Sequence, residues 1–298
     1  ARAQAAGIRV VVVDDHSADA TATAAVAAGA EVVAAGALPH GWLGKPWALA
    51  QGLKRVDTRW VLLLDADIEL RPGLLVSLRA EARRRRAQCA SLLAAPALDS
   101  PWSRLLMPAF VYFFLGLYPF RLANDPRSRV AAAAGGCALV DAVALRGLGG
   151  FDVIRDALID DCRLAGAFKR AGYRTWIGLS RSVQSLRAEQ GPGRLWRMVA
   201  RSAYTQLGHS PWRLGGCTLA MIALYVLPLA AFAWPPHGPA LALAAWLLTA
   251  VTQVPTLRFY GLSPLRALSL PFVALLYLAM TWHSAWWAWR GQGPEWKG

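Results

Sequence analysis

The sequence has few cysteines and histidines, and both kinds are poorly placed for structural chemistry. The four cysteines have neither the spacing of a zinc site nor that of a disulfide framework, so we expect reduced, small apolar side chains. They are Cys89, Cys137, Cys162 and Cys217. The five histidines are scattered, and we expect none of them to bind a metal. The sequence therefore does not predict a zinc protein or a disulfide-rich secreted domain.

Acidic residues are also scarce, and they nearly vanish from the last third of the chain. From Pro211 onward Glu295 is the single Asp or Glu, and long apolar runs rich in Trp and Leu take over. This shift predicts two domains, residues 1–210 and residues 211–298. The formal net charge is +14 at pH 7. Because many arginines flank apolar segments and no nucleic-acid motif is present, the charge favours an anionic membrane surface over nucleic acid.

Three apolar segments of the second domain approach the length of a membrane span. They run from Leu214 to Trp234, from Pro239 to Val254 and from Leu270 to Trp289. A bilayer core needs about 20 apolar residues in a helix, so the second segment is short and depends on its flanks. A fourth run, Leu105 to Phe120, lies in the first domain. It is either an interfacial helix beside the membrane or a buried core helix.

Strands and helices alternate through the first domain, which predicts a doubly wound α/β sheet. Ile8 to Val13 and Glu31 to Val33 are expected to be strands. Trp60 to Leu64 is a near-continuous apolar strand, as in a parallel sheet that is buried on both faces. The chain opens almost directly onto a strand, so we expect the first strand of the domain to be missing from this sequence.

Two acidic pairs follow expected strands, at the edge of a sheet where ligands bind. Asp65 and Asp67 come directly after the apolar strand. Two carboxylates at this spacing can hold a divalent cation, which in turn neutralises a diphosphate. Asp14 and Asp15 follow the first strand, and they can either contact a ligand or cap the next helix together with Ser17.

A third acidic pair, Asp160 and Asp161, precedes an apolar helical face. Adjacent carboxylates in a first helical turn offset the helix dipole. A carboxylate near a cofactor site can also remove a proton from an acceptor hydroxyl. The residues alone leave both readings open.

The motifs of the chain, taken in order, resemble those of family 2 glycosyltransferases with the GT-A fold. They are Val13-Asp14-Asp15-His16-Ser17, Gly44-Lys45-Pro46-Trp47-Ala48-Leu49, Leu64-Asp65-Ala66-Asp67, Gly135-Gly136-Cys137-Ala138-Leu139-Val140, Gly149-Gly150-Phe151-Asp152 and Asp160-Asp161-Cys162-Arg163-Leu164-Ala165. Three further motifs resemble the membrane branch of the family that is associated with hopanoid biosynthesis. They are Trp42-Leu43-Gly44-Lys45-Pro46-Trp47, Tyr118-Pro119-Phe120 before Asn124-Asp125-Pro126, and Glu295-Trp296-Lys297-Gly298.

The resemblance implies a nucleotide-sugar site. Asp14 and Asp15 match the pair that contacts the nucleoside, and Lys45 matches a basic residue near the nucleotide. Asp65 and Asp67 match the pair that binds nucleotide-sugar and a metal, Mg²⁺ or Mn²⁺.

The resemblance also implies an acceptor side. Gly135 and Gly136 match a turn where the backbone approaches donor or acceptor closely, which a bulky side chain would prevent. Asp161 matches the general base of the Glu-Asp motif. The family's Glu is Asp160 here, so the resemblance leaves open which of the two is the base.

One family motif, Gln-x-x-Arg-Trp, is not present as such. Arg194-Leu195-Trp196-Arg197 and Arg201-Ser202-Ala203-Tyr204-Thr205-Gln206 occupy its region. Arg197 and Arg201 lie one helical turn apart. They are candidates for contact with a diphosphate or for an anchor at the membrane interface.

From these features we expect an inverting, metal-dependent glycosyltransferase of the hexosyltransferase type, which uses a UDP-sugar and a lipid acceptor. The branch points to a hopanoid, and a polyprenyl phosphate or a ceramide-like lipid stays open. An inactive membrane scaffold with the same fold is the alternative from another class. We expect the bacterial inner membrane as location, with the catalytic domain in the cytoplasm. Three spans would then place Glu295 to Gly298 outside.

Overall fold

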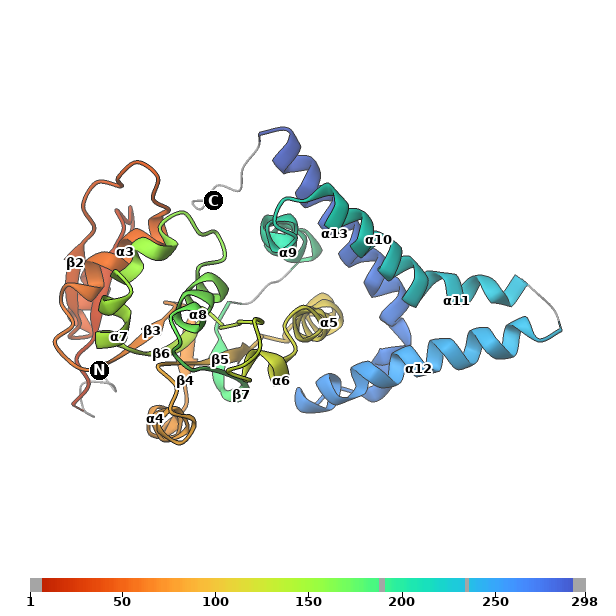
Figure 1. Ribbon diagram of the computed structural model, residues 1–298, viewed down its shortest axis with the longest axis horizontal. Helices are drawn as coiled ribbons and strands as arrows, with labels where there is room; N and C mark the ends of the chain where they lie inside the picture. Colours follow the sequence, from red (N-terminus) through yellow and green to blue (C-terminus); the bar gives the residue numbers. More distant parts are fainter. Residues whose placement is uncertain (1–6, 188–190, 234–235, 292–298) are drawn as a thin grey trace. The chain divides into compact units, whose positions relative to one another are not determined.

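Figure 1 shows the computed structural model of the protein, which describes residues 7–187, 191–233 and 236–291. The chain forms two compact units. Unit 1 consists of Ala1–Ala66, Arg71–Leu93 and Phe120–Ser180. Unit 2 consists of Asp67–Leu70, Ala94–Pro119 and Arg181–Gly298. Each unit therefore contains segments that are distant in the sequence.

Unit 1 begins with a small parallel sheet. Strands β1 (Val11–Asp14) and β2 (Glu31–Ala34) pair in parallel, with Val11 opposite Glu31. Parallel neighbours need a crossover, and helix α2 (Thr21–Ala27) provides it. The strand ends at Asp14, as the valine run followed by Asp14 and Asp15 predicts.

The larger sheet of unit 1 contains strands in the order β3-β6-β5-β7. They are β3 (Trp60–Leu64), β6 (Cys137–Asp141), β5 (Cys89–Ala95) and β7 (Thr175–Ser185). Strand β6 runs antiparallel to both β3 and β5. The expectation that Trp60 to Leu64 lies in a parallel sheet is therefore wrong, because β6, the strand beside β3, runs in the opposite direction.

Burial differs between the two apolar strands of this sheet. All five residues of β6 are buried, whereas β3 is partly buried and Leu64 is 43% exposed. The reason is position, since β3 is the end strand of its sheet among the described residues and β6 is interior. An apolar run of this length does not distinguish the two positions.

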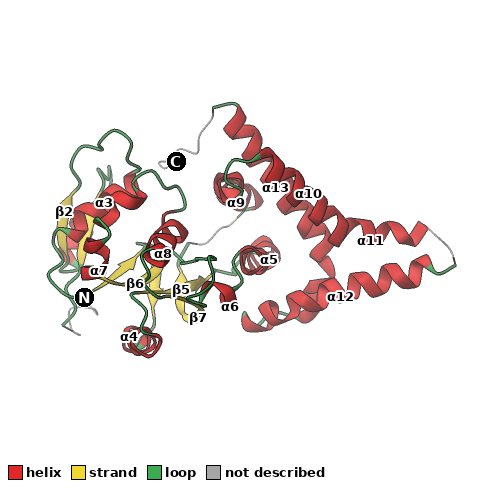
Figure 2. Cartoon of the chain, in the orientation of Figure 1, coloured by secondary structure: helices red, strands yellow, loops and turns green. Residues whose placement is uncertain are grey.

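Helices cover the larger sheet on both faces. Figure 2 shows α4 and α8 on opposite sides of the strands. The helical elements of unit 1 after α2 are α3 (Gly44–Leu53), α4 (Leu74–Arg85), α6 (Phe120–Ala123), α7 (Ala142–Gly147), η1 (Gly150–Ile154) and α8 (Asp160–Arg170). One core cluster joins α8 to β6 and η1, with Phe168, Val140 and Phe151 fully buried in it. The α/β class expected from the sequence is confirmed.

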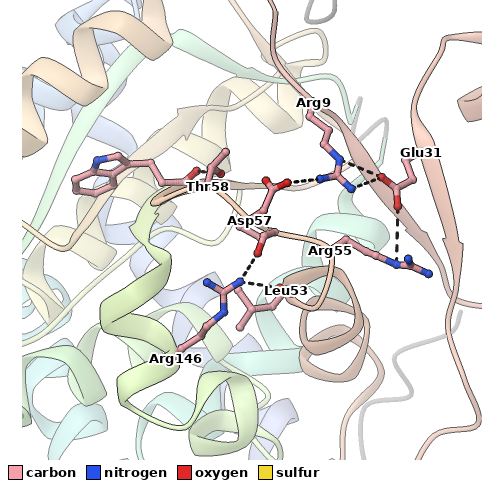
Figure 3. A network of polar contacts seen from close by, with 9 residues as sticks. Arg9, Glu31, Leu53, Arg55, Asp57, Thr58 and Arg146 are labelled. Carbon is pink, nitrogen blue, oxygen red and sulfur yellow. Dashed lines mark hydrogen bonds and ion pairs between the residues drawn. The ribbon is translucent and has the colours of Figure 1, made fainter.

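A polar network joins β1 and β2 to the chain that leads into β3 (Figure 3). The Arg9 guanidinium lies 2.8 Å from Glu31 Oε2 and 3.1 Å from Asp57 Oδ2. Arg146 donates to the backbone carbonyls of Leu53 and Val56. Because the Arg9 ion pairs are exposed, they stabilise the unit little, and they fix the approach of the chain to β3.

Unit 2 combines one short strand with helices. Strand β4 (Ile68–Leu70) pairs antiparallel with the last residues of β7, and Leu70 lies opposite Val183. The helical elements are α5 (Pro101–Leu117), α9 (Pro192–Gln206), α10 (Pro211–Met221), η2 (Ile222–Val226), α11 (Leu227–Ala230), η3 (Ala231–Ala233), α12 (Gly238–Phe259), η4 (Pro264–Ser269) and α13 (Leu270–Trp289).

Three helical stretches of unit 2 are long and apolar enough to cross a membrane. They are Pro211–Ala233, Gly238–Phe259 and Pro264–Trp289. The second has 22 residues and is longer than predicted, because α12 continues through Pro255, where a helix usually ends. The expected C-terminal helical region is confirmed. Trp234 and the final motif, Glu295 to Gly298, lie outside the described residues.

Helix α5, which corresponds to the run from Leu105 to Phe120, packs inside unit 2. Leu106 and Ala109 share a buried cluster with Leu195 of α9 and with Val273 and Tyr277 of α13. The Tyr277 hydroxyl donates to the carbonyl of Leu106 at 2.8 Å. Further along α5, the Tyr112 hydroxyl lies 3.2 Å from the Tyr225 hydroxyl in η2. Helix α5 is thus held by the helices of unit 2 through both apolar and polar contacts.

Candidate functional site

Carboxylates from separate elements of unit 1 converge on Lys45. Lys45 lies in the first turn of α3, Asp65 directly follows β3, and Asp160 and Asp161 open α8. Together with Gly135, which precedes β6, they line one pocket of about 30 Å³. This is room for about two water molecules, so the side chains themselves fill most of the site.

The Lys45 ammonium is held between two carboxylates. Its Nζ lies 3.0 Å from Asp65 Oδ1 and 3.3 Å from Asp160 Oδ2. The side chains of Lys45 and Asp160 are only 21% and 13% exposed. Burial alone would lower the pKa of Lys45, but the charges of Asp160, Asp65 and Asp161 together raise it. The ammonium is therefore firmly charged at neutral pH.

Asp161 sits in a different environment from its neighbour. Its Oδ2 accepts a hydrogen bond from the backbone N–H of Gly135 at 2.8 Å, and its Oδ1 accepts one from the N–H of Cys162 at 2.6 Å. Burial, and next the charge of Asp160, raise the pKa of Asp161 to about 6, against the opposing effects of Lys45 and the two N–H groups. A carboxylate with this pKa is poised to exchange a proton near neutral pH.

The turn at Gly135 and Gly136 joins the two sides of the pocket. The N–H of Gly135 reaches Asp161, and the carbonyl of Gly136 accepts from the N–H of Asp65 at 3.3 Å. A Cβ at Gly135 would lie 3.1 Å from Lys45 Nζ and 3.3 Å from Asp161 Oδ2. Gly135 is thus closely approached by side chains of the site, and the predicted approach of this turn to donor or acceptor stays a prediction.

Two contacts that the sequence did not predict hold Ala133 and Ala134, the residues directly before this turn. The N–H of Ala134 donates to the hydroxyl of Ser91 at 3.2 Å, and the thiol of Cys162 lies 3.6 Å from the carbonyl of Ala133. Ser91 is fully buried in β5. A lone hydroxyl in an otherwise apolar buried strand is the signal that points to such a residue, because buried polar groups need partners.

Asp14 ends β1, Asp15 follows it, and neither residue lines this pocket. Asp14 Oδ1 accepts from the N–H of Ser17 at 3.3 Å, so the turn-forming alternative has a contact in its support. Asp15 Oδ1 lies 3.4 Å from His16 Nδ1. These contacts do not address the predicted nucleoside role, which stays a prediction.

The remaining predicted site residues belong to unit 2. Asp67 precedes β4, and its Oδ2 lies 3.3 Å from Nε of Arg187, a residue that the sequence analysis did not single out. Nothing in the local sequence around Arg187 distinguishes it from other surface arginines. On α9, Arg197 is exposed and Arg201 is partly buried. The predicted diphosphate contacts of this arginine pair stay a prediction.

The predicted metal, Mg²⁺ or Mn²⁺, would need carboxylates of the site as ligands. Within residues 7–187, 191–233 and 236–291, no three His, Cys, Asp or Glu residues form a group that could hold a metal ion. Mg²⁺ is commonly held by one or two carboxylates together with substrate phosphates. Asp65 belongs to unit 1 and Asp67 to unit 2, and the metal role of this pair stays a prediction. Two of the cysteines are poor metal ligands, because burial raises the pKa of Cys89 and of Cys137 to about 12.

The model of one protein family, glycosyl transferase family 2, matches residues 1–149, which is half of the chain. The chain belongs to this family. The matched residues include Lys45, Asp65 and the turn at Gly135 and Gly136. Unit 1 is accordingly the GT-A-like α/β part of a family-2 glycosyltransferase. The predicted resemblance to the family is confirmed, and the hopanoid branch stays a prediction.

Among curated proteins, none matches this glycosyltransferase. Solved structures that are similar include glucosyl-3-phosphoglycerate synthase from Mycobacterium tuberculosis with phosphoglyceric acid, at 17% identity and a TM-score of 0.43, covering 67% of this chain and 68% of that one. The same enzyme with Mn²⁺, UDP-glucose and phosphoglyceric acid has 18% identity and a TM-score of 0.43, covering 66% and 67%. A mycobacterial protein has 19% identity and a TM-score of 0.45, covering 67% of this chain and 63% of that one.

Proposed function

We propose that this family-2 glycosyltransferase moves a hexosyl group from a UDP-sugar to a membrane lipid, with inversion at the anomeric carbon. The observation that carries the proposal is the pocket of unit 1, where Lys45 meets the carboxylates of Asp65, Asp160 and Asp161. An ammonium suits a phosphate, and a buried carboxylate suits the proton of a hydroxyl. The pocket thus offers groups for both partners of a glycosyl transfer.

The donor would be bound by residues that follow β1 and β3. Asp14 and Asp15 are proposed to contact the nucleoside, and Lys45 the diphosphate. Asp65 and Asp67, two residues apart in the chain, would hold Mg²⁺ or Mn²⁺. Such an ion stabilises the negative charge that develops on the departing diphosphate. Arg197 and Arg201 are further candidates for contact with the diphosphate.

The acceptor would be activated at the start of α8. Its hydroxyl oxygen forms a bond to the anomeric carbon while the bond from that carbon to the diphosphate oxygen breaks. The hydroxyl proton passes to Asp161, and UDP leaves with the electron pair. Each oxygen of Asp161 keeps a lone pair besides the one that accepts an N–H, so the carboxylate can take a proton without losing its position. Asp160 is the alternative base.

The helices of unit 2 support a lipid as the acceptor. Three stretches that can cross a membrane would keep residues 211–298 in the bilayer, with residues 1–210 as the catalytic part. Arg258 lies at the end of the second stretch and Arg266 near the start of the third, and both fit the cytoplasmic side. We therefore place the protein in the bacterial inner membrane with its active site in the cytoplasm. A hopanoid is the first acceptor to test, followed by polyprenyl phosphates and ceramide-like lipids.

The test uses the full chain in nanodiscs, a panel of UDP-sugars, Mg²⁺ or Mn²⁺, and extracted bacterial lipids. We expect UDP release that requires both the ion and the lipid extract, and the mass of the product identifies the acceptor. Asp65→Asn and Asp161→Asn should each lower kcat by about 100-fold or more. Asp156→Asn is the matched control, because Asp156 is exposed and pairs with Arg163 at 3.5 Å.

The contrary outcome is equally specific. If no UDP-sugar turns over and UDP does not bind with either metal, the transferase proposal is wrong. The protein would then be a membrane scaffold that has kept the fold.

A further inference from the structure

The ammonium of Lys45 supplies a positive charge among the carboxylates of the pocket, where a cation would otherwise be needed to balance them. It lies 3.0 Å from Asp65 Oδ1 and 3.3 Å from Asp160 Oδ2. Asp161 adds a third carboxylate whose charge acts on it. Gly135 borders the same place, since a Cβ there would come within 3.1 Å of Nζ. The pocket is therefore built closely around this one positive charge.

A divalent ion on Asp65 would meet that ammonium. It would share the carboxylate with a positive charge that is already within hydrogen-bond distance, and the partly buried setting screens their repulsion poorly. For the ion to bind, Lys45 has to leave Asp65. Departure without a new anion would exchange two ion pairs for one, with Asp160 Oδ2 at 3.3 Å, in a confined pocket, which is unfavourable.

The diphosphate of a donor supplies the missing anion. Lys45 has four methylene groups and can redirect its ammonium to a phosphate oxygen without movement of α3. The ion can then take its place on Asp65, with phosphate oxygens completing the ligand set. Binding of the diphosphate draws Lys45 away from Asp65, which frees this carboxylate for the ion. Binding of the ion to Asp65 in turn favours the move of Lys45 to the diphosphate.

We infer that Lys45 excludes a free divalent cation from Asp65 and passes to the donor diphosphate, so that ion and nucleotide bind as a pair. The inference rests on the proposed function, because it assigns a nucleoside diphosphate to this pocket. It adds a binding order to the proposed function, because the ion binds only together with the nucleotide.

The experiment measures binding and not turnover. Full-length protein in detergent is titrated by calorimetry with Mn²⁺ alone, with UDP alone in the presence of a chelator, and with Mn²⁺ in the presence of UDP. Lys45→Gln removes the charge, and Lys45→Arg keeps it. Lys54→Gln is the matched control, since Lys54 caps the other end of α3 and its Nζ contacts Gln51.

We expect Lys45→Gln to change the affinities for Mn²⁺ alone and for UDP alone in opposite directions. Lys45→Gln should bind Mn²⁺ alone roughly tenfold more tightly than the wild type, and UDP alone roughly tenfold more weakly. Lys45→Arg and Lys54→Gln should behave like the wild type. Simple damage to the fold would weaken both ligands, so it cannot imitate this result. If Lys45→Gln does not fold, Lys45→Met preserves the apolar stem and takes its place.

Two outcomes overturn the inference, and they are distinguishable. If Mn²⁺ alone binds the wild type as tightly as it binds Lys45→Gln, Lys45 does not exclude the ion, although UDP binding would leave the proposed function intact. If neither UDP nor Mn²⁺ with UDP binds the wild type or Lys54→Gln, the proposed function itself fails.

Discussion

At the scale of single residues, Asp161 would, as the proposed base, link catalysis to pH. Its pKa is raised to about 6, and a protonated carboxyl cannot take the acceptor's proton. We expect kcat/KM to fall as the pH drops through about 6. Asp160→Asn removes the second cause of the raised pKa, so the acidic limb should move to lower pH. A pH profile of both proteins checks this, and a limb that stays in place in Asp160→Asn would argue against Asp161 as the base.

Gly135 is the other residue whose role can be isolated. A methyl group there would press on Lys45 and on Asp161, at 3.1 and 3.3 Å, while the backbone needs no unusual conformation. We expect Gly135→Ala to fold normally and to lose about 10- to 100-fold in kcat, through displacement of both side chains. The control is Gly116→Ala in α5, where no atom lies within 4 Å of the added Cβ. Full activity of Gly135→Ala would show that the turn tolerates bulk.

At the scale of elements, β5 supports the site through Ser91. Its buried hydroxyl accepts from the N–H of Ala134 at 3.2 Å, so Ser91→Ala leaves a donor without a partner. We expect a loss of about 1–3 kcal/mol in the free energy of unfolding. Thr175→Val is the matched control, because the buried Thr175 hydroxyl has no partner among the described residues. Thermal unfolding of both variants is the measurement, and equal midpoints would contradict the prediction.

Lys169 connects the C-terminal end of α8 to a loop of unit 1. The ammonium donates to backbone carbonyls of Leu122, Asp125, Ser128 and Val130, which lie before the Gly135 turn in the chain. Lys169→Met should therefore destabilise unit 1 by about 1.5–3 kcal/mol. Lys54→Met, an exposed lysine of α3, should have little effect. Hydrogen exchange of residues 122–134 would locate the change, and unaltered exchange there would refute this role of Lys169.

The elements also show what the sequence can and cannot predict. The apolar run from Trp60 to Leu64 predicts β3 with its observed bounds. The direction of the strand beside β3 is not encoded in that run, so the antiparallel β6 was missed. The motifs place Lys45, Asp65, Asp160 and Asp161 by analogy. Their contacts with one another depend on the conformation of loops, which the local sequence does not determine. The contacts of Lys169 with a loop distant in the sequence could not be predicted for the same reason.

At the scale of the whole molecule, three helical stretches of unit 2 are long and apolar enough to cross a membrane, and the proposed location depends on them. If residues 211–298 lie in the bilayer as proposed, the turn between α12 and η4 faces the cytoplasm. Leu265 follows that turn, in η4, and is 74% exposed, so Leu265→Cys should react with an impermeant maleimide in inverted vesicles and not in intact cells. The wild type, with its own four cysteines, gives the background. Labelling from the outside would reverse the proposed orientation.

The π-helical turn Ile222–Val226 lies inside the first of these stretches. A turn of this kind holds one residue more than an ordinary helical turn. Past it, every side chain is rotated by about 100° from the position that an unbroken α-helix would give it. Tyr225 lies inside the turn, with its hydroxyl 3.2 Å from that of Tyr112, while Leu224 and Leu227 are exposed. Loss of a single residue here would restore a regular helix and rotate Leu227 and the side chains after it by about 100°, so the length of this segment is constrained as well as its composition.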